Sequence, residues 1–421
     1  MKDQESVFIS LLRQELVPAL GCTEPIAVAY TAALARQLLG TMPESMEVWC
    51  SGNIIKNVKS VTVPNSGGMQ GIEAAAVLGI LGGDAKLSLE VLQPVTQEHR
   101  TRARELLRGN FCVCKYLESD SPLDILIRVY AGEHNAAVEI RRHHTNVVLL
   151  EKDGASVLET QAQSQTESAC EGVWTLEDIL DFVDQVDTTQ LEPIFSRQIE
   201  LNSAIAKEGL ENPYGAQIGR ILLQGNPDSP QTLAMARAAA GSDARMSGCA
   251  MPVVINSGSG NQGLTASLPV VTYAQALGTS EEKTLRALAL SNLAAIYQKR
   301  QIGSLSAYCG AVCAACGSGA AITYLYGGTR EQIGQTIVNT IACVGGILCD
   351  GAKPSCAAKI ATCVNAAILA HKLAMAGQGF HPGEGLVKAD ADKTIQCYGD
   401  IAREGMRDTD RMILEKMLEP A

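Results

Sequence analysis

"LDILIRVYAGEHNAAVEIRRHHTNVVLLEKDG", residues 123–154, alternates apolar and polar side chains over most of its length. A period of two residues is typical of β-strands that bury one face of a sheet. Glycine and asparagine between the apolar runs favour tight turns, which join antiparallel strands. The stretch therefore predicts the centre of a largely antiparallel sheet.

Neighbouring segments extend this pattern on both sides. Further strand-like segments are "SMEVWCSG" (45–52), "VKSVTVP" (58–64), "KLSLEVLQPV" (86–95), "FCVCKYLE" (111–118) and "SVLET" (156–160). Two segments have helical periodicity instead, "GIEAAAVLGILGG" (71–83) and "TQEHRTRARELLRGN" (96–110). Together they predict a small α/β domain over residues 46–158.

The second half of the chain has a different pattern. Residues 175–421 contain Ala-rich apolar runs broken by Gly, such as "QTLAMARAAAGSDARMSG" at 231–248, and few convincing strands. Aromatic residues make up only 4% of the chain, so its core must consist of small and aliphatic side chains, which suit closely packed helices. We expect an α+β protein with a large all-α domain over 175–421 and a smaller, mainly antiparallel α/β domain.

Two further segments complete the predicted organisation. Residues 1–45 predict N-terminal helices that carry a Gly-Cys-Thr-Glu-Pro motif (21–25) and pack on the helical domain. The polar segment "ETQAQSQTESACEG" (159–172) is typical of a linker between domains.

Charge and hydropathy exclude several classes of partner. The formal net charge is −11 and the isoelectric point is about 5.2, which argues against nucleic acid or an anionic membrane as the main partner. No secretory signal is visible, so we expect a cytoplasmic protein. Residues 310–328 are long enough to span a membrane, but their Gly, Ala and Cys content favours a tightly packed internal helix.

Cysteines are concentrated in one region, where seven of the fourteen lie between residues 309 and 363. Cys349 and Cys356 flank "DGAKP" (350–354), a sequence that interrupts a helix and would let both sulfurs turn toward one point. Thiolates are soft ligands that select zinc, copper(I) or iron–sulfur clusters. Cysteine also packs as a small hydrophobe, and spacing alone leaves both interpretations open for Cys309, Cys349 and Cys356.

Two glycine-rich loops are built alike. "VPNSGGMQGIEAA" (63–75) and "INSGSGNQGLTASLP" (255–269) each place Asn-Ser-Gly and then Gln-Gly before a small-residue helix. Backbone N–H groups, hydroxyls and a helix start suit a carboxylate or phosphate, whereas the P-loop and dinucleotide fingerprints are absent. A pair of ordinary turns is the alternative. The candidate binding residues are Asn65, Ser66, Gly67, Ser257, Ser259 and Asn261.

Two single residues are further candidates. Cys22 in "LGCTEPIAVA" (20–29) stands immediately before a predicted helix, whose partial positive charge would lower the pKa of the thiol. It is a candidate nucleophile, base or metal ligand. His144 in "RHHTNVV" (142–148) ends a strand-like segment and is a solvated edge residue, a ligand or a proton carrier.

Several of these blocks together resemble one family. The blocks are "PALGCTEPIAVAYTAA" (18–33), "NIIKNVKSVTVPNSGGMQG" (53–71), "HTNVV" (144–148), "NSGSGNQG" (256–263), "YCGAVCAACGSGAA" (308–321) and "CDGAKPSCAAK" (349–359). In this order they resemble the L-cysteine desulfidase family, whose bacterial members were grouped as an uncharacterised family related to the α chain of iron–sulfur L-serine dehydratases. The resemblance extends over essentially the whole chain.

This resemblance implies an oxygen-sensitive [4Fe–4S] cluster in the helical domain. Three cysteines would hold it, at positions that match Cys309, Cys349 and Cys356, and the fourth iron would be open to substrate. The implied reaction is β-elimination of L-cysteine to sulfide, pyruvate and ammonia, with the open iron acting as a Lewis acid on the leaving sulfur.

The resemblance also suggests roles for the remaining candidates. Cys22 is the expected base for the α-proton, and the glycine-rich loops would hold the substrate carboxylate. His144 and Lys353 are secondary candidates for proton handling or charge stabilisation. Alternatives are dehydration of L-serine or another β-substituted amino acid, a non-catalytic metal- or amino-acid-binding protein, and a zinc-bound structural protein. We expect a homodimer.

Overall fold

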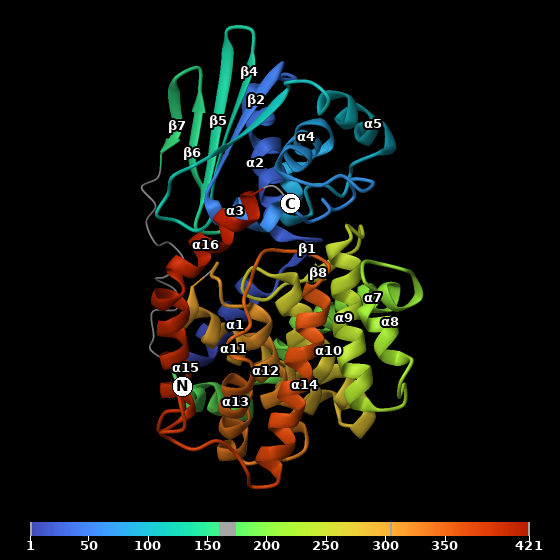
Figure 1. Cartoon of the computed structure of the whole chain (residues 1–421), viewed down its shortest axis with the longest axis vertical. Helices are drawn as coiled ribbons and strands as arrows, with labels where there is room; N and C mark the ends of the chain where they lie inside the picture. Colours follow the sequence, from blue (N-terminus) through green and yellow to red (C-terminus); the bar gives the residue numbers. More distant parts are fainter. Residues whose placement is uncertain (1, 160–173, 304, 420–421) are drawn as a thin grey trace.

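The computed structural model describes residues 2–159, 174–303 and 305–419. A sheet body stands above a larger helical body, and the chain termini lie on different levels of the molecule (Figure 1). Apart from its first residue, the predicted linker at 159–172 lies outside the described residues.

The sheet body contains one six-stranded sheet with the strand order β3-β2-β4-β5-β6-β7. Only β2 and β3 pair in parallel, and every other neighbouring pair is antiparallel. Its elements are α2 (Thr23–Leu39), β2 (Ser45–Cys50), α3 (Gly52–Val58), α4 (Ile72–Gly82), η1 (Ala85–Glu90), α5 (Gln97–Leu106), β3 (Cys112–Tyr116), β4 (Asp124–Ala131), β5 (His134–Arg141), β6 (Val147–Lys152) and β7 (Ala155–Glu159).

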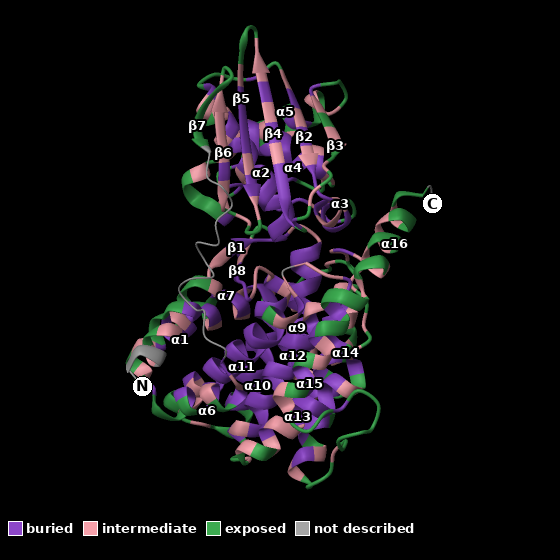
Figure 2. Ribbon diagram, turned by 90° about the vertical axis from the view of Figure 1, so that its left-hand side faces the viewer, coloured by how far each residue is buried: buried purple, intermediate pink, exposed green. Residues whose placement is uncertain are grey.

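Alternation along β4 builds the core of this body. Ile125, Ile127 and Val129 are completely buried, whereas the residues between them are partly exposed. Helices α2 and α4 pack over the sheet (Figures 1 and 2). A Cβ at Gly79 would lie 2.3 Å from the carbonyl oxygen of Ala29, so glycine is what allows α4 to approach α2 this closely.

Two predicted strands of this body are wrong. In the segment 58–64, Val58 ends α3 and the rest is a loop whose Thr62 forms an isolated bridge with Gln70. Residues 86–95 form the short helix η1 and turns. In both segments most of the apolar side chains are buried, although Leu87 is exposed. Carbonyl groups of Leu92 and Val95 accept from the side-chain amide of Asn65 and need no neighbouring strand.

The helical body confirms the predicted all-α second half, with the short strand β8 (Pro252–Val254) as an exception. Its elements are α1 (Lys2–Glu15), α6 (Leu176–Gln185), η2 (Thr188–Gln190), α7 (Glu192–Glu211), α8 (Ile218–Leu223), α9 (Pro230–Met246), α10 (Gly260–Leu277), α11 (Glu281–Ile302), α12 (Gly310–Leu325), α13 (Arg330–Val344), α14 (Cys356–Met375), α15 (Ala391–Asp400), the π-helical η3 (Ile401–Gly405) and α16 (Arg407–Leu418). The fold is therefore α+β.

Small residues let these helices pack closely, as the composition predicts. Helix α12 is central and almost wholly buried (Figure 2). A Cβ at its Gly317 would lie 2.2 Å from the carbonyl oxygen of Ser291 in α11. No helix in the described ranges is both long and apolar enough to cross a membrane, which agrees with the interpretation of residues 310–328 as a packed helix.

The two N-terminal helices separate. α1 packs against α6 and α11, as expected, but α2 packs against α4, β4 and β5 of the sheet body. The prediction that both helices pack on the helical domain is therefore wrong for α2. Its Ala-rich faces suit close packing against the sheet. The predicted domain limits remain predictions.

A short antiparallel ribbon connects the two bodies. Strand β1 (Pro18–Leu20) lies between α1 and α2, and it pairs with β8 in the register Pro18↔Val254, Ala19↔Val253, Leu20↔Pro252. The sequence did not predict β1. The ribbon brings the Gly-Cys-Thr-Glu-Pro motif, which follows β1, next to the second glycine-rich loop, which follows β8.

The buried His371 of α14 should make stability fall in acid. Its Nδ1 lies 3.0 Å from the hydroxyl of Thr323, and its ring packs on Tyr326. Burial lowers its pKa to about 4, so the unfolded chain binds a proton first as the pH falls below about 6.5. We expect a loss of up to about 2 kcal/mol in the free energy of unfolding between pH 6.5 and pH 4.

Thermal unfolding across this pH range tests that expectation. His371→Gln keeps a polar group beside Thr323 but cannot titrate, so its melting temperature should fall less steeply with pH than that of the wild type. Parallel slopes for the two proteins would contradict the assignment.

Candidate active site

A cavity of about 590 Å³ lies where the two bodies meet. Its walls come from the Gly-Cys-Thr-Glu-Pro turn, the β5–β6 connection, the loop before α10, the end of α11, the start of α12 and the loop before α14. Cys22, His144, Ser257, Ser259, Asn261, Cys309, Cys349 and Cys356 all line it.

Backbone pairing places Cys309 beside Cys349. Tyr308 and Leu348 form an antiparallel bridge. The N–H of Cys309 donates to the carbonyl of Ile347 at 3.0 Å, and the N–H of Cys349 donates to that of Ala307 at 2.6 Å. Two segments 40 residues apart in the sequence are thereby fixed next to each other.

The loop from Cys349 to Cys356 then returns the chain to the cavity. Cys356 is the first residue of α14, and its thiol lies 3.8 Å from the carbonyl oxygen of Gly351. Gly351 has a φ of 88° and rests on α3, where a Cβ would lie 2.3 Å from the carbonyl oxygen of Lys56. Its left-handed backbone and this close approach both require glycine.

Lys353 holds this loop in shape and does not face the cavity. Its ammonium pairs with Asp350, which also pairs with Lys359, and it donates to the carbonyl of Gly351 at 3.1 Å. Lys353 is not among the described residues that line the cavity. Cys313 and Cys316 are buried inside α12 and also lie away from the lining.

Partly buried thiols and a buried ammonium share one end of the cavity. Burial raises the pKa of Cys309 to about 12, with Cys349 adding to the effect, and burial also raises the pKa of Cys356. Lys299 of α11 lines the same cavity and is only 7% exposed. Burial lowers the pKa of Lys299, whereas Cys309 and Cys349 act in the opposite direction.

The described residues contain no preformed site for a single metal ion. No group of three or more His, Cys, Asp or Glu side chains within these ranges converges closely enough to hold one. A zinc ion requires its ligands about 2.0–2.3 Å from one point. The three cavity cysteines therefore do not form a site of that kind.

Cys22 faces the same cavity from the opposite body. It precedes α2 as its N-cap residue and is buried beside Val61 and Met246, with Ala352 and Cys356 packed against them. Its thiol donates to Glu24 at 3.1 Å. The pKa of Cys22 is raised, first by burial and then by the negative charge of Glu24. The predicted depression by the helix start is therefore wrong, because desolvation outweighs the helix dipole.

The second glycine-rich loop lies next to this motif. The hydroxyl of Thr23 donates to Glu24 and to the carbonyl of Gly258 at 2.8 Å. Ser257 has a φ of 48°, and its hydroxyl donates to Asn256 at 2.8 Å. Ser259 is the N-cap of α10, yet its side chain makes no capping hydrogen bond. Of the two loops, this one borders the cavity.

The first glycine-rich loop has a different position. Asn65, Ser66 and Gly67 are not among the described residues of the cavity wall. Asn65 donates to the carbonyls of Leu92 and Val95, Ser66 donates to that of Met69, and Arg104 donates to that of Gly67. The loop supports the site from behind, because Pro64 fills the space where Gly21 would carry a Cβ.

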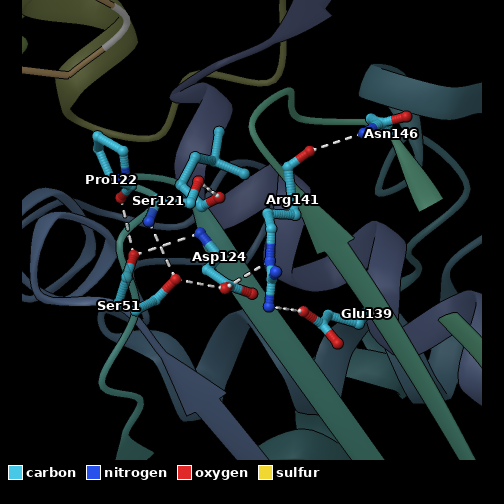
Figure 3. A network of polar contacts seen from close by, with 9 residues as sticks. Ser51, Ser121, Pro122, Asp124, Glu139, Arg141 and Asn146 are labelled. Carbon is cyan, nitrogen blue, oxygen red and sulfur yellow. Dashed lines mark hydrogen bonds and ion pairs between the residues drawn. The ribbon is translucent and has the colours of Figure 1, made fainter. Parts of the chain in front are cut away.

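A polar network around Asp124 and Arg141 fixes the ends of β4 and β5 (Figure 3). Asp124, at the start of β4, accepts from Arg141 at 2.9 Å, and Arg141 also pairs with Glu139. The side chain of Asn146 donates to the carbonyl of Arg141 at 2.8 Å and closes the turn that carries His144. The network thus fixes the β5–β6 connection, although His144 itself is held by burial.

His144 points an unpaired nitrogen into buried space. Its Nε2 is sealed from solvent and has no hydrogen-bond partner in the described ranges, and its ring packs on Gly258. Burial lowers its pKa, whereas Glu24 raises it. The imidazole is therefore neutral near pH 7 and ready to accept or donate one hydrogen bond.

Sequence reasoning missed many polar residues of the cavity, among them Glu24, Arg245, Gln262 and Lys299. Arg245 and Lys299 are cations buried in helices, with 2% and 7% exposure. An arginine within the Ala-rich run at 231–248 was the available signal, since a charge on a buried helix face needs a partner.

Several helices begin at this cavity. Cys22, Ser259 and Cys309 are the N-cap residues of α2, α10 and α12, and none of them makes a side-chain capping bond. Cys356 opens α14. Helix starts carry partial positive charge, so the cavity suits an anionic ligand together with soft sulfur donors.

Comparisons with known proteins find similarity over most of the chain. A family model described as serine dehydratase alpha chain matches residues 86–415. The UPF0597 proteins of Lachnoclostridium phytofermentans and Treponema denticola are 53% and 47% identical to this chain, over 97% and 99% of it and 99% of each relative. That of Desulfitobacterium hafniense is 45% identical over 98% of this chain and 96% of the relative. The similarity thus covers both bodies.

Proposed function

Since this chain belongs to the serine dehydratase alpha chain family, we propose that it is a [4Fe–4S]-dependent lyase that eliminates sulfide from L-cysteine. Pyruvate and ammonia are the other products. At the coarser level, the family match supports a serine-dehydratase-like lyase. The observation that carries the finer proposal is that Cys309, Cys349 and Cys356 line one cavity together with Cys22.

The three cysteines suit a cluster in their chemistry. All are thiols, and Lys299 supplies positive charge near Cys309 and Cys349, while Lys359 interacts with Cys309 and Cys356. Cys309, Cys349 and Cys356 would hold the cluster from the wall of this cavity. When bound by three cysteines, such a cluster supplies an open iron that acts as a Lewis acid.

The chain's own residues would remove the α-proton. The thiol of Cys22 already donates to Glu24 at 3.1 Å. Transfer of that proton to Glu24 would have to overcome the raised pKa of Cys22. It would leave a thiolate, which would take the proton from Cα of the substrate. The electron pair forms the Cα–Cβ double bond as the C–S bond breaks, and sulfide leaves with that bond's electrons. Aminoacrylate then tautomerises and is hydrolysed to pyruvate and ammonia.

Other residues prepare this step. Lys299, buried beside Cys309 and Cys349, would stabilise the negative charge of departing sulfide. His144 offers a neutral imidazole with a free Nε2. Lys353 serves through the loop that it holds, and Asn65, Ser66 and Gly67 serve through support of the Cys22 turn.

Anaerobic reconstitution with iron and sulfide tests the proposal. Sulfide and pyruvate release would be followed with L-cysteine and L-serine in parallel, alongside iron and zinc analysis. We expect iron incorporation and faster release from L-cysteine. A reconstituted iron protein that releases pyruvate from neither amino acid would contradict the lyase and leave a binding protein, and zinc in place of iron would exclude the cluster.

L-Serine is the second candidate substrate, because the matching family model is described as serine dehydratase. An open iron can activate a hydroxyl as well as a thiol, and a pocket discriminates weakly between such similar groups. Pyruvate without sulfide, from L-serine alone, would favour this alternative. The homodimer and the cytoplasmic location remain predictions.

A further inference from the structure

A buried arginine in the cavity has no acidic partner among the residues that the structure describes. Arg245 ends α9 with 2% exposure, and its Nε donates to the carbonyl of Gly21 at 2.7 Å. Among the described residues, neither of its terminal nitrogens has a hydrogen-bond partner, and no carboxylate forms an ion pair with it. A buried guanidinium is costly unless a counter-charge satisfies it.

Glycine in the second loop makes room for this side chain. A Cβ at Gly260 would lie 2.3 Å from Nε of Arg245 and 2.9 Å from its Cζ. The guanidinium therefore packs against the backbone at the start of α10, and its free side borders the cavity. Glycine at the start of the Gly-Asn-Gln sequence (260–262) is thus needed to pack against the guanidinium, and the two amides of this sequence supply polar groups.

Two amides beside the arginine are also unsatisfied. Oδ1 of Asn261 and Oε1 of Gln262 are buried and have no hydrogen-bond partner within the described part of the chain. Gln262 is 4% exposed and packs on Gly310, next to Cys309, where a Cβ would lie 2.6 Å from its Cδ. An amide oxygen accepts from an ammonium, so a cation site adjoins the free guanidinium.

We propose that Arg245, Asn261 and Gln262 form the subsite that recognises the α-amino-acid backbone of the substrate. Arg245 binds the carboxylate, and the amide oxygens of Asn261 and Gln262 accept from the α-ammonium. This inference rests on the proposed lyase function and assigns the carboxylate to a residue outside both glycine-rich loops. In this arrangement the β-substituent of the substrate would point toward Cys309, next to Gly310.

Calorimetric titration of the reconstituted protein with L-alanine measures this subsite without turnover, because L-alanine has no leaving group. L-Alaninamide, which lacks the carboxylate, is the comparison ligand. We expect the wild type to bind L-alanine at least about tenfold more tightly than L-alaninamide. Arg245→Gln should weaken L-alanine binding by about 10- to 100-fold and leave the amide unaffected.

Further variants separate this role from folding. Gly260→Ala should displace the guanidinium and weaken L-alanine binding while Arg245 itself is retained. Arg237→Gln is the matched control on the same helix: its side chain donates to Thr272 at 3.0 Å and does not line the cavity. We expect this control to bind L-alanine as the wild type does.

The outcomes distinguish the subsite from the reaction. In turnover, Arg245→Lys should raise KM far more than it lowers kcat, with the visible absorbance of the cluster unchanged. Carboxylate-dependent binding without turnover would overturn the lyase but keep the subsite. Equal L-alanine binding by wild type and Arg245→Gln, or no binding by the wild type, would overturn the subsite.

Discussion

Replacing Cys349 with alanine should abolish both the cluster and the reaction. Cys349 is fixed beside Cys309 by the bridge between Tyr308 and Leu348. Among the described cavity residues, no other cysteine on that segment could replace it. We expect the visible absorbance of the reconstituted protein to disappear and turnover to fall below about 0.1% of the wild type, because the Lewis acid is lost.

Cys343→Ala is the matched control for this experiment. Cys343 lies six residues earlier in α13, is exposed and does not line the cavity. It should retain iron content, absorbance and activity. Full turnover by Cys349→Ala, or an equal loss of turnover in Cys343→Ala, would contradict an iron-centred mechanism that depends on Cys309, Cys349 and Cys356.

Replacing Cys22 with alanine should have a large effect of another kind. The cluster ligands remain, so iron content and absorbance should match the wild type. Turnover should fall by about 10²- to 10⁴-fold, the usual contribution of a positioned base. Glu24→Gln should act in the same direction, since Glu24 accepts the thiol proton at 3.1 Å.

Deuterium exchange at Cα gives this prediction a second measurement. Wild-type protein in heavy water should exchange the α-proton of recovered L-cysteine faster than Cys22→Ala does. Cys50→Ala serves as the control, because Cys50 is buried in the sheet body away from the cavity. Loss of cluster absorbance in Cys22→Ala would show that Cys22 is a ligand and would contradict its assignment as the base.

The fold could be predicted where one periodicity holds over a whole element. This holds for the strands predicted within residues 123–154 and for the helices predicted from the Ala-rich runs of the second half. The segments at 58–64 and 86–95 were mistaken for strands because loop side chains can also alternate between core and solvent. β1 was missed, since three residues give no period and its partner β8 lies more than 200 residues away.

The chemistry of single side chains pointed to residues that lie together, although their roles remain predictions. Cys309, Cys349 and Cys356 share one cavity, although only packing could show that Cys313 and Cys316 point elsewhere. The two glycine-rich loops have similar sequences but different positions. In the first loop the side-chain amide of Asn65 donates to the backbone carbonyl of Leu92, away from the cavity. Arg245 and Gln262 lacked a motif, and their burial became apparent only with neighbouring helices in place.

The three-residue ribbon between β1 and β8 has an evolutionary consequence. Since Cys22 of the sheet body meets Cys309, Cys349 and Cys356 of the helical body at a cavity next to that pairing, we expect that neither half alone would be a self-sufficient catalyst. A gene split between them would yield two inert polypeptides that regain chemistry on reassociation, and the segment around Pro18–Leu20 would have to travel with the sheet-body fragment.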